Sequence, residues 1–265
     1  MKTRVISATV AFVLLLIVVF APKQVLTAAI FVLAVIGLHE FYSAVSTAGY
    51  RPVKLIGYLA CIPLLVVGYM KAEYVMLCVF AVLAVLMALI VFKHERYNII
   101  DISLTSFGIL YVPFLFLFII LTRNLDNGFY FMWMIFIGAW ATDTFAYFAG
   151  VFLGKRKLIP SISPKKTVEG SIGGIIGCMA VMTLYGILAI NSRLGNIPIY
   201  HYIIISFLCG IISQVGDLAA SAIKRYVNIK DYGKIMPGHG GVLDRFDSIL
   251  FVAPVIYFYI SFFII

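Results

Sequence analysis

The feature that most constrains this chain is a series of long apolar runs with short charged segments between them. A helix needs about 20 mostly apolar residues to cross the hydrocarbon core of a bilayer. Runs of about this length recur from one end of the sequence to the other, so we predict an all-α polytopic membrane protein of about nine transmembrane helices. The expected spans are residues 5–21, 25–42, 55–70, 73–92, 104–121, 129–149, 171–190, 200–223 and 248–265.

Composition supports this prediction and limits the domain organisation. Of the 265 residues, 63% are hydrophobic and only 12% are charged, whereas a soluble domain is about half apolar and about a quarter charged. Nine spans leave no room for a sizeable soluble domain. We therefore expect one membrane domain over residues 1–265, in which 1–128 supply mainly scaffold spans and 129–265 supply the catalytic spans and cytoplasmic loops.

The distribution of positive charge predicts an orientation. With the N-terminus in the cytoplasm, 16 of the 20 Lys and Arg residues fall in cytoplasmic segments and 4 fall in the opposite set. The positive-inside rule then places the C-terminus outside, in a cell (inner or plasma) membrane. The net charge of +9 is accordingly interpreted as loop charge that faces anionic lipid head groups, not nucleic acid.

The four cysteines add no chemistry. Cys61, Cys78, Cys178 and Cys209 all lie in apolar segments and form no Cys-x-x-Cys pair. Free cysteines of this kind behave as small buried hydrophobic residues. The sequence therefore predicts neither a disulfide framework nor a zinc site.

Polar chemistry is concentrated in residues 221–247, between two apolar runs. These 27 residues hold five Lys or Arg, three Asp, four Gly and one His. Such a density of charge beside the membrane favours work on a charged ligand. Gly238, Gly240 and Gly241 would let backbone N–H groups approach an anion closely.

The spacing of the carboxylates predicts a metal site. Asp244 and Asp247 are three residues apart, so a helix would place them on one face. Asp217, Ser221 and Lys224 share another helix face. We expect Asp217, Asp244 and Asp247 to converge on one hard cation, for which Mg²⁺ is the natural candidate. A second cation such as K⁺ is left open.

Two further carboxylates lie in the apolar runs. Asp143 is inside the sixth run. An ionised group there costs at least about 2.5 kcal/mol, so its side chain should face a protein interior or an aqueous cavity. Glu40 lies near the end of the second run, where a solvated carboxylate is favoured over a functional one.

Two motifs resemble those of a known family. Ser-x-Ile-Lys-Arg from Ser221, Lys-Asp-x-Gly from Lys230 and Pro-x-His-Gly-Gly-Val-x-Asp-Arg-Phe-Asp from Pro237 match the signature of phosphatidate cytidylyltransferases, also called CDP-diacylglycerol synthases. Ser-Pro-Lys-Lys-Thr-Val-Glu-Gly from Ser163 is similar to a second stretch of that family. The resemblance covers the C-terminal half; the N-terminal half is similar only in hydropathy.

The resemblance implies Mg²⁺-dependent transfer of a cytidylyl group from CTP to phosphatidate, giving CDP-diacylglycerol and pyrophosphate for phospholipid synthesis. CTP, phosphatidate and the bilayer are the implied partners, and a homodimer is left open. The implied catalytic residues are Asp217, Asp244, Asp247, Lys224, Arg225 and Arg245. The implied substrate-binding residues are Asp143, Lys165, Lys166, Thr167, Glu169, Gly170, Ser221, Lys230, Asp231, His239, Gly240 and Gly241.

Two other functions use some of the same features. A CTP-dependent lipid kinase of the polyprenol or dolichol type would need the same phosphate-binding parts but would release CDP. A cation-coupled transporter would also place Asp residues inside spans. It would not need the Gly-rich loop or the paired Asp residues, and the complete signature argues against both alternatives.

Overall fold

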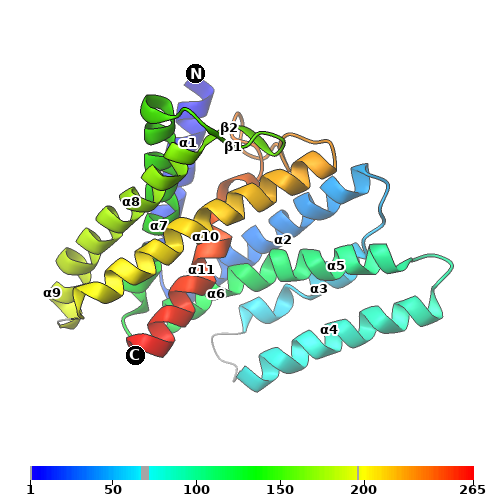
Figure 1. The fold of residues 1–265 in the computed structure, drawn as a ribbon. Helices are drawn as coiled ribbons and strands as arrows, with labels where there is room; N and C mark the ends of the chain where they lie inside the picture. Colours follow the sequence, from blue (N-terminus) through cyan, green and yellow to red (C-terminus); the bar gives the residue numbers. More distant parts are fainter. Residues whose placement is uncertain (1, 67–71, 196) are drawn as a thin grey trace. The chain divides into compact units, whose positions relative to one another are not determined.

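The structure is a computed structural model that describes residues 2–66, 72–195 and 197–265, and these are predominantly helical (Figure 1). Six helical segments are long and apolar enough to cross a membrane, which confirms a mainly helical, multi-pass membrane protein. These segments are Lys23–Thr47, Ile99–Asn124, Gly128–Leu153, Val168–Leu194, Ile199–Tyr226 and Leu243–Phe263.

The other three predicted spans differ from this pattern. Two shorter apolar helices, Thr9–Phe20 and Met76–Phe92, correspond to the first and fourth predicted spans. The third, at 55–70, extends into residues that lie outside the described part. What is described there is two short pieces, α3 (Lys54–Leu59) and the 3-10 helix η1 (Ile62–Leu65). The count of nine spans therefore stays a prediction.

The chain divides into two compact units. The first comprises Met1–Leu121 and Tyr226–Arg245, and the second comprises Thr122–Arg225 and Phe246–Ile265. The 221–247 stretch is thus divided between the units: 226–245 belong to the first, and 221–225 with 246–247 belong to the second. Besides α3 and η1, the first unit contains α1 (Lys2–Phe20), α2 (Lys23–Thr47), α4 (Ala72–Phe92), α5 (Ile99–Tyr111) and most of α6 (Pro113–Asn124).

The core of the first unit forms around α2 and α5. Tyr42 of α2 is fully buried, and its hydroxyl donates a hydrogen bond to the carbonyl of Thr105 on α5 (3.0 Å). Its ring packs against Gly57 and Gly108. A Cβ at either position would overlap the Tyr42 side chain, so both positions require glycine. Asp101 is buried and begins α5 through a capping box with Asn98.

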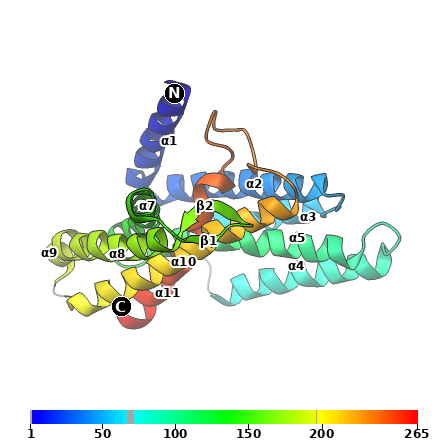
Figure 2. The same ribbon diagram turned by 45° about the horizontal axis from the view of Figure 1, so that its top comes forward.

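The second unit contains helices α7 (Gly128–Leu153), α8 (Val168–Tyr185), α9 (Asn191–Leu194), α10 (Ile199–Tyr226) and α11, together with a π-helical turn, η3 (Gly186–Ile190). Helix α11 (Leu243–Phe263) begins in the first unit and continues into the second. Small residues let α7 and α8 lie side by side (Figures 1 and 2). A Cβ at Gly174 would lie 2.9 Å from the carbonyl oxygen of Thr142, so only glycine permits this approach.

One short hairpin departs from the all-α prediction. Strands β1 (Lys157–Ile159) and β2 (Ser163–Thr167) are antiparallel and pair Lys157 with Thr167 and Ile159 with Ser163. They lie in the segment between α7 and α8, which the sequence predicts only as a basic loop. Their few residues give no extended alternation of polar and apolar side chains, which explains why hydropathy does not predict them.

Candidate functional site

The β1–β2 hairpin is fixed to the start of α8 by residues that the sequence assigns to substrate binding. Thr167 is buried, and its Oγ1 accepts a hydrogen bond from the N–H of Gly170 (3.1 Å), which caps α8. The Glu169 carboxylate accepts from the N–H groups of Lys155 (3.0 Å) and Arg156 (3.2 Å). These contacts organise the hairpin, and direct substrate contact by Thr167, Glu169 and Gly170 stays a prediction.

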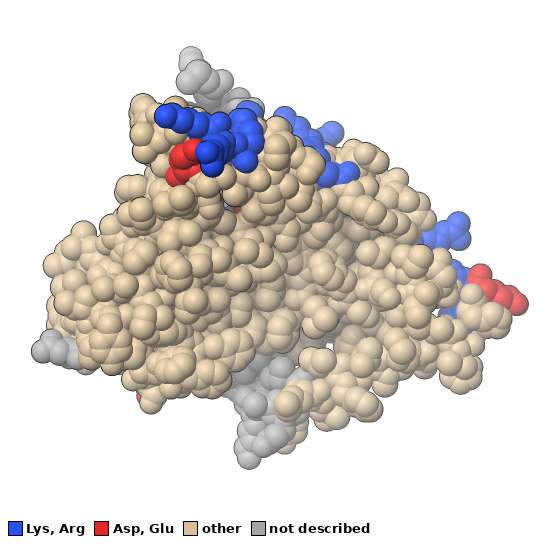
Figure 3. Space-filling view, in the orientation of Figure 1, with Lys and Arg blue, Asp and Glu red and all other residues tan. Residues whose placement is uncertain are grey.

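This arrangement presents a group of cations. Basic side chains gather in the part of Figure 3 that β1 and β2 occupy in Figure 1. Most of the other surface visible in that view carries no charged residue. Several donors held on one small hairpin suit an anion with several phosphate oxygens. The basic residues of the hairpin and its approach are Lys155, Arg156, Lys157, Lys165 and Lys166.

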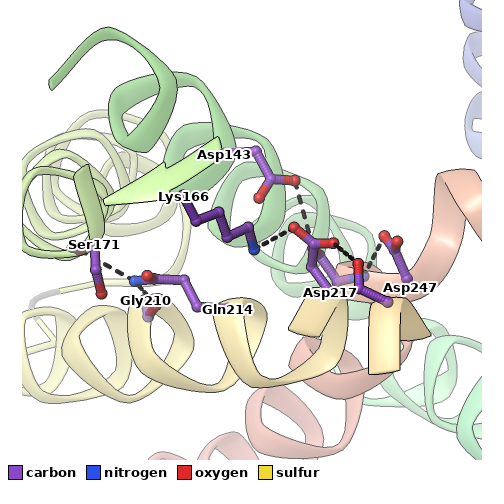
Figure 4. Close-up of polar contacts among 9 residues, drawn as sticks. Asp143, Lys166, Ser171, Gly210, Gln214, Asp217 and Asp247 are labelled. Carbon is purple, nitrogen blue, oxygen red and sulfur yellow. Dashed lines mark hydrogen bonds and ion pairs between the residues drawn. The ribbon is translucent and has the colours of Figure 1, made fainter. Parts of the chain in front are cut away.

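Lys166 of the hairpin makes an ion pair with helix α10. Its ammonium contacts the carboxylate of Asp217 on α10 (Figure 4), and both side chains are about a quarter exposed. The Ser221 hydroxyl donates to the same carboxylate (3.4 Å), which confirms that Asp217 and Ser221 share a helix face. The hairpin and α10 are thereby joined through opposite charges.

Two more carboxylates face this ion pair (Figure 4). Asp247 on α11 accepts from the N–H of Ser248 (2.8 Å). The Ser248 hydroxyl in turn donates to Asp143 on α7 (3.4 Å). Asp143, Asp217 and Lys224 all act electrostatically on the Asp247 carboxylate. We call Asp143, Asp217 and Asp247 the acidic cluster.

A glycine allows α10 and α11 to approach at this point. A Cβ at Gly216 would lie 2.6 Å from the carbonyl oxygen of Asp247 and 2.9 Å from the Phe251 ring. The glycine that precedes Asp217 therefore brings that carboxylate to the start of α11. Hydropathy predicts the two helices, but not this close approach between them.

The composition of the cluster suits a hard cation. Three carboxylates repel one another, and Lys166 and Lys224 supply two positive charges. Within the described ranges, no three His, Cys, Asp or Glu side chains are gathered closely enough to hold a metal ion by themselves. Mg²⁺ does not require such a cage, because it commonly uses one or two carboxylates and completes its shell with water and substrate phosphates. The oxygen donors of Asp217 and Asp247 fit that mode.

Asp244, in the first turn of α11, is hydrogen-bonded by the loop that precedes this helix. It lies in the first unit and is buried, and its Oδ2 accepts from the N–H groups of Tyr232 (2.8 Å) and Gly241 (2.9 Å). Gly240 next to it has a positive φ of 84°, which favours glycine. The N–H of Gly241 is thus directed at a carboxylate of the protein itself. A metal-binding role for Asp244 stays a prediction.

The remaining predicted residues are placed individually. In the first unit, His239 Nδ1 lies 2.9 Å from the Ser7 hydroxyl, which also donates to the carbonyl of Pro237 (3.0 Å). In the second unit, Arg225 Nε donates to the carbonyl of Ile162 (3.4 Å). The exposed predicted residues are Asp143, Lys165, Arg225, Lys230, Asp231 and Arg245. Their contacts with substrate stay predictions.

Glu40 is the residue whose setting the sequence interpretation gets wrong. It is expected to be solvated, but its side chain is only 3% exposed. Its two oxygens accept from the N–H groups of Val242 and Leu243, both at 3.0 Å. Helix α2 continues past the predicted end at residue 42 to Thr47, which places Glu40 inside the helix. The only signal in the sequence is an acidic residue inside an apolar run.

Comparison with known proteins assigns the chain to a family. The model of the cytidylyltransferase family matches residues 2–263, almost the whole chain. The chain belongs to the cytidylyltransferase family. Family membership therefore extends to the N-terminal half, where the sequence alone shows similarity only in hydropathy.

Several curated relatives of this protein carry the name phosphatidate cytidylyltransferase. This chain is 33% identical to the phosphatidate cytidylyltransferase of Bacillus subtilis, over 99% of this chain and 98% of the relative. It is 32% identical to that of Staphylococcus saprophyticus and 30% identical to that of Staphylococcus aureus, over 97% of each chain. The similarity covers nearly the whole of this chain, so it includes both units.

Proposed function

We propose that this protein transfers the cytidylyl group of CTP to phosphatidate, forming CDP-diacylglycerol and pyrophosphate. The observation that carries the proposal is the family match along 2–263, with relatives of nearly equal length named phosphatidate cytidylyltransferase. An acidic cluster beside a basic hairpin in a multi-pass membrane protein supports it. The lipid can keep its acyl chains in the bilayer while its phosphate meets a water-soluble nucleotide.

The reaction needs charge neutralisation more than proton transfer. A phosphate oxygen of phosphatidate forms a bond to the α-phosphorus of CTP, while the bond from that phosphorus to the bridging oxygen of the β-phosphate breaks. The nucleophile is already ionised near neutral pH, so no strong general base is needed. Lys166, Lys224 and Arg225 are proposed to bind phosphate oxygens and to stabilise the charge that develops on pyrophosphate.

A divalent cation is proposed as the cofactor. Bound Mg²⁺ would supply further neutralisation of the triphosphate. Asp217 and Asp247 would hold it, with Asp244 as a third predicted ligand and Asp143 beside them. A second cation such as K⁺ and a homodimeric assembly stay predictions. The proposed role of the carboxylates is thus to bind the cation at the position where the substrate phosphates must lie.

The position of the broken bond tests the activity. Purified protein in detergent would receive phosphatidate, Mg²⁺ and CTP labelled with ³²P at either the α- or the γ-position. We expect α-label to enter a chloroform-soluble lipid and γ-label to appear in water-soluble pyrophosphate. A parallel reaction with a polyprenol or dolichol in place of phosphatidate tests the lipid kinase, which would transfer the γ-label to that lipid with CDP as co-product. Label that enters no lipid, together with CTP-independent cation flux in vesicles, would favour a transporter.

We also propose that the β1–β2 hairpin faces the cytoplasm, as the charge asymmetry predicts. Ser161 in the hairpin turn and Ser192 in α9 are both exposed and offer matched serine-to-cysteine variants. In a background without the four native cysteines, an impermeant thiol reagent should label Ser192→Cys in right-side-out vesicles. Ser161→Cys should react only after permeabilisation. Efficient labelling of Ser161→Cys in intact vesicles would contradict the orientation.

A further inference from the structure

The contact between Glu40 and the start of α11 has consequences for the signature. Glu40 lies on α2, about 200 positions before Val242 and Leu243 in the chain, yet each of its carboxylate oxygens accepts one of their N–H groups at 3.0 Å. All three residues belong to the first unit. A buried carboxylate carries a large desolvation cost unless it is hydrogen-bonded. The two charge-assisted hydrogen bonds and the positive end of the α11 dipole offset that cost.

Two signature glycines are explained by the same carboxylate. A Cβ at Gly233 or at Gly241 would overlap Oε1 of Glu40. For Gly241, the three nearest atoms all belong to the Glu40 carboxyl group. Neither glycine has a positive φ, so the requirement at these two positions is space and not backbone conformation. Gly233 and Gly241 leave room for Glu40.

Glu40 and Asp244 together accept from the three consecutive N–H groups of residues 241–243, and Asp244 also accepts from the N–H of Tyr232. The loop 232–242 is therefore fixed by carboxylates at both ends of its Gly-rich part. Helix α11 starts directly after it and carries Asp247 one turn further on.

We propose that Glu40 is a positioning residue for the cytidylyl transfer, holding the loop 232–242 and the first turn of α11 in the orientation that the reaction requires. This inference rests on the proposed function. Glu40 acts through the loop and makes no contact with substrate itself. Its loss should therefore lower the rate for protein that is still folded, and not merely lower the yield of folded protein.

Glu40→Gln tests this role because the side chain keeps its size. The amide has one acceptor oxygen where the carboxylate has two, so one buried N–H loses its partner and the loop must shift. Asp101→Asn is the matched control. Asp101 is also a buried carboxylate of the first unit and accepts from the N–H groups of Arg51 (2.6 Å) and Asn98 (3.3 Å), but it holds a different loop. Both variants should lower the Tm in detergent.

The decisive measurement is kcat per folded, monodisperse protein, well below the Tm, with α-labelled CTP. We expect Glu40→Gln to lose roughly 10- to 100-fold in kcat with a smaller change in KM, because small misplacements are costly in catalysis. Asp101→Asn should stay close to wild type. Equal kcat values for the two variants would show that Glu40 only stabilises the fold and would overturn the proposal.

A double-mutant cycle supplies a second test that does not depend on the Gln variant. Gly233→Ala places a methyl group against the Glu40 carboxyl, so it should lower kcat in the wild-type background. In the Glu40→Ala background that carboxyl is absent, and adding Gly233→Ala should cost much less. Additive losses would contradict the assignment. If the wild type forms no lipid from α-label, the proposed function fails; if it does and the cycle is additive, only the role of Glu40 fails.

Discussion

Replacing Asp247 with Asn is expected to reduce turnover by roughly 100-fold or more while the protein remains folded. The substitution preserves the size of the side chain and leaves an oxygen that can accept from the N–H of Ser248. It removes one negative charge from a cluster in which Asp143 and Asp217 act on the same group. Metal-assisted charge stabilisation is worth several kcal/mol, and each ~1.4 kcal/mol changes a rate about tenfold.

The same result is expected for Asp217→Asn, with a weaker response of the rate to Mg²⁺ in both variants. Initial rates across a Mg²⁺ titration would measure this, and size-exclusion chromatography would check the fold. Asp126→Asn is the control, because Asp126 is exposed in the turn between α6 and α7. Near-normal rates at low Mg²⁺ for Asp217→Asn and Asp247→Asn would show that the metal site lies elsewhere.

The sequence predicts those parts of the site that depend on local spacing. A period of 3.6 residues places Asp217 and Ser221 on one helix face, and the hydrogen bond between them confirms it. The cost of an intramembrane charge predicts that Asp143 faces a protein interior or an aqueous cavity; its side chain is exposed and accepts a hydrogen bond from the Ser248 hydroxyl. Both inferences use only neighbouring residues and the properties of the bilayer.

Long-range partners are not available from such patterns. The distance along the chain from Glu40 to Val242, and from Lys166 to Asp217, carries no periodic signal. The i,i+3 spacing of Asp244 and Asp247 suggests one site, but backbone N–H groups of the preceding loop occupy Asp244 Oδ2. A glycine motif likewise does not say what needs the space. In the structure, the space beside Gly233 and Gly241 is occupied by the Glu40 carboxyl group, and the space beside Gly216 is occupied by the α11 backbone.

Lys166→Gln is expected to change Mg²⁺ binding and turnover in opposite directions. The Lys166 ammonium pairs with Asp217, so a divalent cation that uses this carboxylate must compete with it. Removing the ammonium should lower the Mg²⁺ concentration that half-saturates thermal stabilisation in the absence of CTP, since a ligand that binds the folded state raises its stability. Turnover should fall by roughly 100-fold, because the phosphates lose a cation that stabilises developing charge.

Lys157→Gln is the matched control for this prediction. Lys157 is exposed on the neighbouring strand of the same hairpin, and its substitution removes the same charge from the hairpin. Unlike Lys166, it forms no ion pair with Asp217. Its Mg²⁺ half-saturation should stay near that of wild type, so a change specific to Lys166→Gln cannot come from the net charge of the hairpin. If Lys166→Gln instead needs more Mg²⁺, the ammonium does not compete for Asp217, and the cation binds at a carboxylate that Lys166 leaves untouched.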